Sequence, residues 1–137
     1  MAETIQRAEY YYAVVEDKPG EGRKLLEFLS AHSVNLVAFT AFPLDGDKAQ
    51  LDFLLEDASL LKKAADEAGI LLIGPKNAFL IQGDDRTGVL VEHHLRLSDA
   101  GINVYSANGI VDGNGGFGYI LWVKPEEYEK AATALGL

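Results

Sequence analysis

Two short segments of the chain carry residue types that could bind a small zwitterion. They read Asp17-Lys18-Pro19-Gly20 and Asp85-Arg86-Thr87-Gly88, and each precedes a stretch with helical periodicity. A glycine there can adopt a positive φ and let a ligand approach the backbone, and the N-terminus of the following helix offers unpaired N–H groups to a carboxylate. The Asp17 and Asp85 carboxylates could balance an ammonium group. The same residue types also form plain caps and turns, so spacing alone leaves both interpretations open.

Two asparagines add polar groups further along the chain. Asn35 and Asn103 each open a predicted strand, and a side-chain amide can both donate and accept hydrogen bonds. The candidate ligand-binding residues are Asp17, Lys18, Pro19, Gly20, Asn35, Asp85, Arg86, Thr87, Gly88 and Asn103.

These groups recur because the chain contains the same unit twice, without a gap. A shift of 68 positions (85 − 17) superposes the two loops, and it also places Leu29-Ser30 on Leu97-Ser98 and Val34-Asn35 on Ile102-Asn103. The matches cluster at loops, helix ends and strand starts, where backbone geometry restricts residue choice. We predict a duplicated module, with one repeat over residues 8–75 and the other over residues 76–137.

The first repeat predicts the element order βαββαβ, the split βαβ plan of ferredoxin-like folds. Alternating aromatic and β-branched residues indicate a strand at its start. Helical spacing of leucines predicts a helix after the Gly20 loop, and Asp57 caps a second helix, whose apolar stripe begins at Leu60 and ends before Gly69. The predicted strands are Tyr10–Glu16, Asn35–Phe42, Ala49–Leu55 and Ile70–Ile73, and the first helix is Glu21–His32.

The second repeat follows the same order but ends before a fourth strand. Its predicted elements are the strands Ala78–Gln82, Asn103–Val111 and Tyr119–Val123, the helix Gly88–Ala100, and a helix from Pro125. One edge of its first strand would be unpaired, and proteins usually cover such an edge. Ala2–Ala8, a second subunit, or Ile70–Ile73 folded back through Gly74-Pro75-Lys76 could cover it, and the sequence does not choose among them.

The predicted fold class is therefore α+β, with two ferredoxin-like modules in tandem. Each module has an antiparallel sheet with helices on one face, and the second lacks its last strand. The open edge, together with a tyrosine-rich first strand that is apolar on both faces, leads us to expect a homodimer.

Composition excludes several classes of protein. The chain has 137 residues, a formal net charge of −9 and no cysteine, which argues against a nucleic-acid partner, a disulfide framework and a thiolate zinc site. It has no apolar run long enough to span a membrane and no signal-peptide pattern at its start, so we expect a cytoplasmic protein. We find no catalytic arrangement, and we expect no enzyme activity, metal or cofactor.

A glycine-rich segment and a pair of histidines each have both a structural and a functional interpretation. The segment Gly113–Gly118 spells G-x-G-x-x-G, but a strand follows it, so we interpret it as a hairpin turn and not a dinucleotide site. His93 and His94 occupy the positions of Leu25 and Leu26 in the first repeat. They could be half-buried packing residues at a module interface, a ligand contact or a pH sensor. The alternative function is a small ferredoxin-like enzyme that uses one of these histidines.

The repeated pattern resembles that of ACT domains: a strand ending in Asp-basic-Pro/Thr-Gly, a helix, and then a small or apolar residue and Asn that open the next strand. The resemblance covers the chain from about Tyr10 onward, with Thr87 in place of the usual proline. It implies a tandem ACT protein that binds a small molecule, usually an amino acid, and signals to an enzyme or regulator. The ligand would lie between two paired modules, against the glycine loop of one and the asparagine of the other. A pure interaction module without ligand is the remaining alternative.

Overall fold

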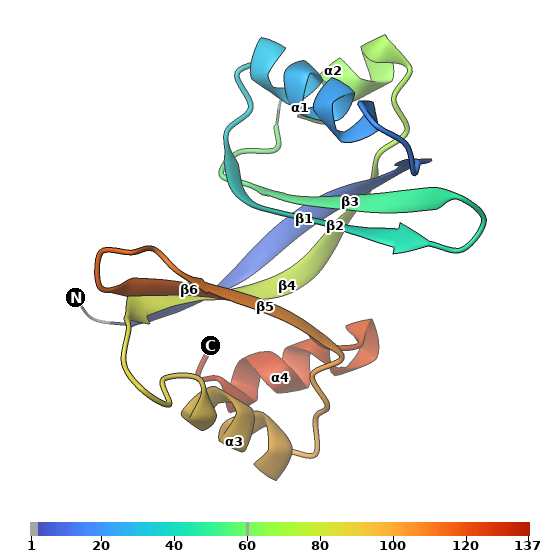
Figure 1. Cartoon of the computed structure of the whole chain (residues 1–137). Coiled ribbons are helices and arrows are strands. Elements are labelled where there is room, and N and C mark those ends of the chain that lie inside the picture. The colour runs from blue at the N-terminus through green and yellow to red at the C-terminus, as the bar shows by residue number, and fades with distance from the viewer. Residues whose placement is uncertain (1–2, 60) are drawn as a thin grey trace. The chain divides into compact units, whose positions relative to one another are not determined.

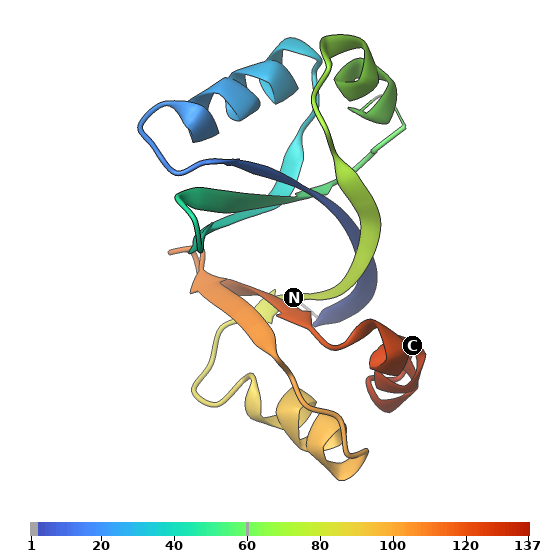
Figure 2. The same ribbon diagram turned by 90° about the vertical axis from the view of Figure 1, so that its right-hand side faces the viewer.

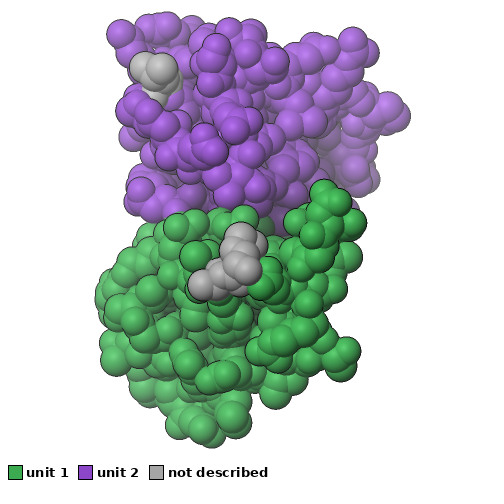
Figure 3. All heavy atoms as spheres, turned by 90° about the vertical axis from the view of Figure 1, so that its left-hand side faces the viewer, with its two compact units in different colours: residues 1–8, 77–137 green, residues 9–76 purple. Residues whose placement is uncertain are grey.

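The computed structural model describes residues 3–59 and 61–137, so Leu60 of the predicted apolar stripe and Ala2 of the predicted covering segment lie outside the described residues. The chain divides into two compact units (Figure 3). Unit 1 consists of Met1–Ala8 and Asn77–Leu137, and unit 2 of Glu9–Lys76. Two strands, β1 (Thr4–Glu16) and β4 (Ile73–Asp84), contribute residues to both units.

Unit 2 is built from the first repeat and has the predicted α+β plan. Its strand order is β2-β3-β1, with β1 and β2 both antiparallel to β3. The two helices lie on the same face of these strands (Figures 1 and 2), where Leu25 and Leu29 pack with Phe53 in the core. Besides its part of β1, the unit contains α1 (Glu21–Ala31), β2 (Leu36–Leu44), β3 (Lys48–Leu55), α2 (Leu61–Ala68) and the first residues of β4.

Unit 1 is built from the second repeat in the same way. Its elements are the rest of β4, α3 (Val91–Asp99), β5 (Ser106–Val111), β6 (Gly116–Trp122), a 3₁₀ turn (Pro125–Glu127) and α4 (Tyr128–Ala134). Strands β4 and β5 are both antiparallel to β6, and both helices cover one face of the strands (Figure 2). The predicted ferredoxin-like architecture of antiparallel sheets with helices on one face is therefore confirmed in both units.

The fourth strand of unit 1 comes from the beginning of the chain. β1 is the neighbour of β4 in the strand order, and the Thr4 hydroxyl donates to the carbonyl of Gln82 over 3.5 Å. Gly83 lies so close to this segment that a Cβ there would be 3.1 Å from the Cα of Glu3. The sequence allowed three ways to cover this edge of β4, and in the structure the N-terminal segment covers it.

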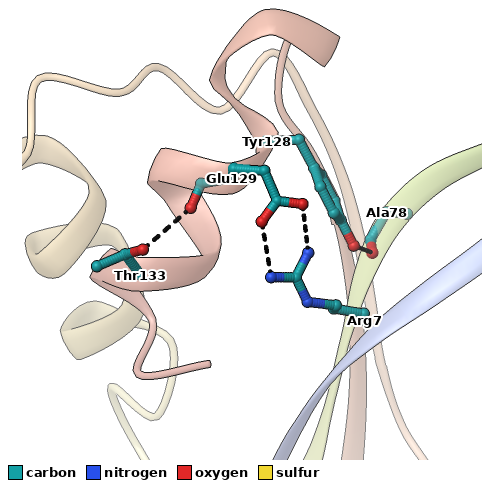
Figure 4. Close-up of polar contacts among 5 residues, drawn as sticks. All are labelled: Arg7, Ala78, Tyr128, Glu129 and Thr133. Atoms are coloured by element: carbon teal, nitrogen blue, oxygen red, sulfur yellow. Dashed lines mark hydrogen bonds and ion pairs between the residues drawn. The ribbon is translucent and has the colours of Figure 1, made fainter.

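Side chains on both sides fasten this N-terminal segment to unit 1 (Figure 4). The Arg7 guanidinium donates to both carboxylate oxygens of Glu129, each over 2.8 Å. This pairing raises the pKa of Arg7 and lowers that of Glu129. Beside it the Tyr128 hydroxyl donates to the carbonyl of Ala78 over 2.8 Å, and Ile5 packs against the core. The segment is therefore held by backbone pairing, an apolar contact and a two-pronged ion pair.

Several predicted boundaries were wrong. Ile70–Ile73 is not a separate strand, because β4 begins at Ile73 and continues to Asp84 through Gly74-Pro75-Lys76. Helix α3 starts at Val91 and not at Gly88, because a turn comes first in which the Val91 N–H donates to the Gly88 carbonyl over 3.0 Å. Strand β5 starts at Ser106, so Asn103 precedes it.

One carboxylate is buried in unit 2. Asp52 is only 5% exposed, on the face of β3 opposite to the one that bears the core residues Leu51 and Phe53. Burial raises its pKa, although the Gln50 amide donates to Asp52 Oδ1 over 2.8 Å and so favours the charged form. Removing water from the charged carboxylate is the larger effect.

Removal of residues 1–8 should destabilise unit 1 selectively. Without the fourth strand, the edge of β4 is unpaired and the contacts of Ile5 and Arg7 are lost. We expect amide hydrogen exchange in Ala78–Gln82 to become much faster, while the amides of Leu51–Leu54 in unit 2 stay protected. Arg7→Ala, which keeps the strand, should produce a much smaller change. Parent-like protection of Ala78–Gln82 in the truncated protein would show that the segment is dispensable.

Replacement of Asp52 by asparagine should stabilise the protein at neutral pH. A carboxylate whose pKa is raised on folding costs stability as the pH rises from its unfolded value, about 3.9, through its folded value. The melting temperature of Asp52→Asn should thus exceed that of the parent at pH 7, and the difference should shrink as the pH falls toward 4. A difference that is constant with pH would contradict the assigned cause.

Candidate functional site

The two glycine loops share an equivalent backbone hydrogen bond and a left-handed glycine. The Asp17 N–H donates to the Asp47 carbonyl over 2.9 Å, and the equivalent Asp85 N–H donates to the Gly115 carbonyl over 2.8 Å. Gly20 and Gly88 have φ angles of 93° and 77°, in the region that other residues enter only at a cost. The glycines therefore permit the turn that carries the chain from each strand toward its helix.

The charged residues of the two loops differ in their partners. Lys18 Nζ lies 2.8 Å from Glu16 Oε2 and 3.6 Å from Glu21 Oε1, and its bond to Glu16 raises the pKa of Lys18 and lowers that of Glu16. Arg86 forms no ion pair with any residue that the structure describes. The loop residues of both repeats, including Pro19 and Thr87, are exposed. In the unit 1 loop, Arg86 is therefore a cation beside Asp85 without an ion-pair partner among the described residues.

The asparagines are positioned by the turn that follows each first helix. The N–H of Val34 donates to the carbonyl of Leu29 over 2.9 Å, and Ile102 donates to Leu97 over the same distance. The side chains of Asn35 and Asn103 come next and are exposed. They therefore lie near the C-terminal end of the helix, whereas the glycine loop lies at its N-terminal end.

Each asparagine lines a groove beside its helix, and the two grooves share most of their equivalent positions. We call them the α1 groove and the α3 groove, with volumes of about 440 and 590 Å³. The α1 groove is lined by Leu26, Leu29, Ser30, Ser33, Val34, Asn35 and Leu36. The α3 groove is lined by Leu90, Val91, His94, Leu95, Leu97, Ser98, Ile102, Asn103 and Val104.

Within one unit, the glycine loop and the asparagine do not line a common groove. Asp17 and Lys18 border a smaller hollow of about 250 Å³ next to Phe42 and Pro43, which Asn35 does not line. The α3 groove reaches Leu90 and Val91, shortly after Gly88, but does not include Asp85–Gly88. The predicted residues thus form two separate sets in each unit.

The two histidines have different environments. His93 is only 3% exposed, and its Nε2 lies 3.1 Å from Glu3 Oε1, although neither ring nitrogen makes a well-aligned hydrogen bond. His93 is more deeply buried than the half-buried packing residue that we predicted. His94 is exposed, and its Nε2 lies 2.7 Å from the hydroxyl of Tyr119. Burial raises the pKa of that tyrosine. Only His94 is placed to touch a ligand.

The glycine-rich segment is a hairpin between β5 and β6, as predicted. Asp112 Oδ1 accepts the N–H of Asn114 over 2.6 Å and that of Gly116 over 3.0 Å. These two bonds lower the pKa of Asp112. Asp112 is not among the residues predicted from the sequence, although Asp at the start of a turn is typical of such hydrogen bonds. The segment precedes a strand and has no helix N-terminus to bind phosphate.

Solved structures of known proteins share this fold. The regulatory subunit of aspartate kinase from Thermus thermophilus, in its ligand-free form, matches with a TM-score of 0.62 over 98% of this chain and 94% of its own, at 16% identity. The subunit from Thermus flavus matches with a TM-score of 0.62 over 99% and 95%, at 14% identity. The protein BT0572 from Bacteroides thetaiotaomicron matches with a TM-score of 0.82 over 96% and 88%, at 17% identity.

The chain has the fold of a tandem ACT protein. The resemblance seen in the loop and asparagine motifs is thus confirmed at the level of fold. No protein-family model matches the sequence, and no curated protein matches it.

Across residues 3–59 and 61–137, no three His, Cys, Asp or Glu side chains gather as metal ligands would. Within the same ranges, every helix is too short or too polar to cross a bilayer.

Two neighbouring glycines should respond oppositely to alanine. Gly20 has a positive φ, whereas Gly22 lies in α1 with an ordinary backbone, and a Cβ at either position would meet nothing within 4 Å. We expect Gly20→Ala to destabilise the protein by about 1–2 kcal/mol and Gly22→Ala to stabilise it by roughly 0.5–1 kcal/mol. Chemical unfolding measures both. Equal effects would mean that the loop does not depend on the left-handed conformation.

Proposed function

We propose that this protein is a non-catalytic regulatory protein that binds an amino acid or a similar small metabolite. Ligand binding would change how its modules or subunits pack, and a regulated enzyme would read that change. The observation that carries the proposal is the pair of glycine loops with matching backbone, each on a module that also presents an exposed asparagine amide. The aspartate kinase regulatory subunits that share the fold support the regulatory role.

The proposed ligand contacts follow from the chemistry of each group. The α-carboxylate would bind at the positive N-terminal end of the helix that follows Gly88 or Gly20, with Arg86 nearby in unit 1. The ammonium would face Asp85 or Asp17, and the amide of Asn103 or Asn35 would complete the contacts. Because neither asparagine groove includes the glycine loop of its own unit, a ligand that contacts both groups would need the loop and the asparagine from different modules. The resemblance to ACT domains implies the same arrangement.

We further propose a cytoplasmic homodimer, but for a different reason from the one the sequence supplied. The edge left open by the second repeat is paired with the chain's own residues 4–8. The outer strands β2 and β5 instead present exposed apolar side chains, among them Phe42 and Ile110. Such edges are suited to pairing with a second copy.

Asn103→Ala should weaken binding while the fold survives. A screen of the amino acids by thermal shift identifies the ligand, which at a hundred times its dissociation constant should add about 2.7 kcal/mol of stability. Loss of one amide contact should weaken binding by roughly 1–3 kcal/mol, and Asn35→Ala tests the pseudo-equivalent site in the same way. Calorimetric titration of both variants measures the effect, with sedimentation to report the subunit state. If both variants bind as tightly as the parent, the asparagines are structural only.

A further inference from the structure

The two helices that border the grooves differ at one pair of positions. In α1, Arg23 and Glu27 lie one turn apart and form an ion pair, with Nε 2.6 Å from Oε1. The shift of 68 places Val91 and Leu95 at these positions in α3, and they are 65% and 54% exposed. Where one copy has a solvated ion pair, the other therefore has two large apolar side chains facing water.

These two apolar side chains change the shape of the α3 groove. Val91 and Leu95 both line it, whereas Arg23 and Glu27 do not line the α1 groove. The α3 groove consequently extends from the start of its helix, three residues after Gly88, to Asn103 at the other end. Its volume of about 590 Å³ is within the range of about 300–1,000 Å³ typical of small-molecule sites.

The lining of the α3 groove is apolar apart from His94, Ser98 and Asn103. None of its lining residues is Asp, Glu, Lys or Arg. A charged ligand side chain placed here would lose water without gaining an ion pair to any of these four residue types. An aliphatic or aromatic side chain would instead cover Val91 and Leu95, which favours binding in proportion to the apolar area removed from water.

His94 supplies a fixed polar contact within the same groove. It replaces Leu26 of the α1 groove, and the hydroxyl of the buried Tyr119 lies 2.7 Å from its Nε2. This contact orients the imidazole, and Nδ1 makes no hydrogen bond to any described residue. A ligand could therefore bond to Nδ1 while its apolar part lies along the helix.

We propose that the α3 groove is the side-chain pocket of the ligand site and that it selects amino acids with an aliphatic or aromatic side chain. This inference rests on the proposed function, because it assigns the ligand class of that site. The two repeats are then unequal: the α3 groove, extended by Val91 and Leu95, binds, and the α1 groove, which has no apolar pair at these positions, does not.

The test is calorimetric titration of the full chain with leucine and phenylalanine, compared with aspartate and lysine. We expect leucine or phenylalanine to bind at least about tenfold more tightly than the charged pair. If aspartate or lysine binds more tightly, the assigned class is wrong while the proposed function stands. If none of the four binds, and no other amino acid does, the proposed function fails and the inference with it.

Two matched double variants locate the pocket. Val91→Arg with Leu95→Glu gives α3 the surface residues of α1, so the fold should be kept, and unfolding of the free variant checks this. It should weaken leucine or phenylalanine binding roughly tenfold or more, whereas the reverse exchange, Arg23→Val with Glu27→Leu, should leave the affinity of the α3 groove unchanged. Parent-like binding by the first variant overturns the inference. So does loss of the dimer in sedimentation without loss of binding, because the groove would then be a subunit contact.

Discussion

The pairing of residues 4–8 with β4 is the constraint on which unit 1 depends. A sheet edge without a partner exposes backbone groups that need hydrogen bonds, and the second repeat contains no strand of its own to supply them. The N-terminal residues satisfy that edge, and the other features of the region follow from it. Ile5 completes the core, Arg7 reaches Glu129, and Glu3 meets the buried His93.

Much of the fold could be predicted from the sequence because local rules and tertiary packing agree. The glycine loops, the helices after them and the hairpins recur at one offset, and the structure repeats the same hydrogen bonds at that offset. Prediction failed where the local signal was ambiguous. Gly74-Pro75 has turn-forming residue types, yet both lie inside a long strand. Whether they turn depends on the strand alongside, which no local pattern reveals.

Only part of the candidate site could be predicted from the sequence. The positions of Gly20, Gly88, Asn35 and Asn103 at loops and helix ends followed from the repeat. The sequence did not predict that each asparagine groove excludes the glycine loop of its own unit. That separation depends on the length and direction of the intervening helix. The aligned repeats place Val91 and Leu95 opposite Arg23 and Glu27, but only the structure shows that these two apolar side chains are exposed. The burial of Asp52 was hidden because strand alternation does not say which face is covered.

The two units differ in how far apart along the chain their parts lie. Unit 2 is a single continuous stretch, whereas unit 1 needs both ends of the chain, and its Arg7–Glu129 contact joins residues separated by 122 positions. Closing so long a loop of flexible chain is entropically costly. Within unit 2, however, β1 and β4 already lie together, with Gly74 packed against Tyr10 and Tyr11. Once unit 2 has folded, the two strands leave it side by side, so a contact that is remote in the sequence becomes a local extension of an existing pair. This arrangement favours an order of folding in which the inner segment folds first and the residues that flank it pair afterwards.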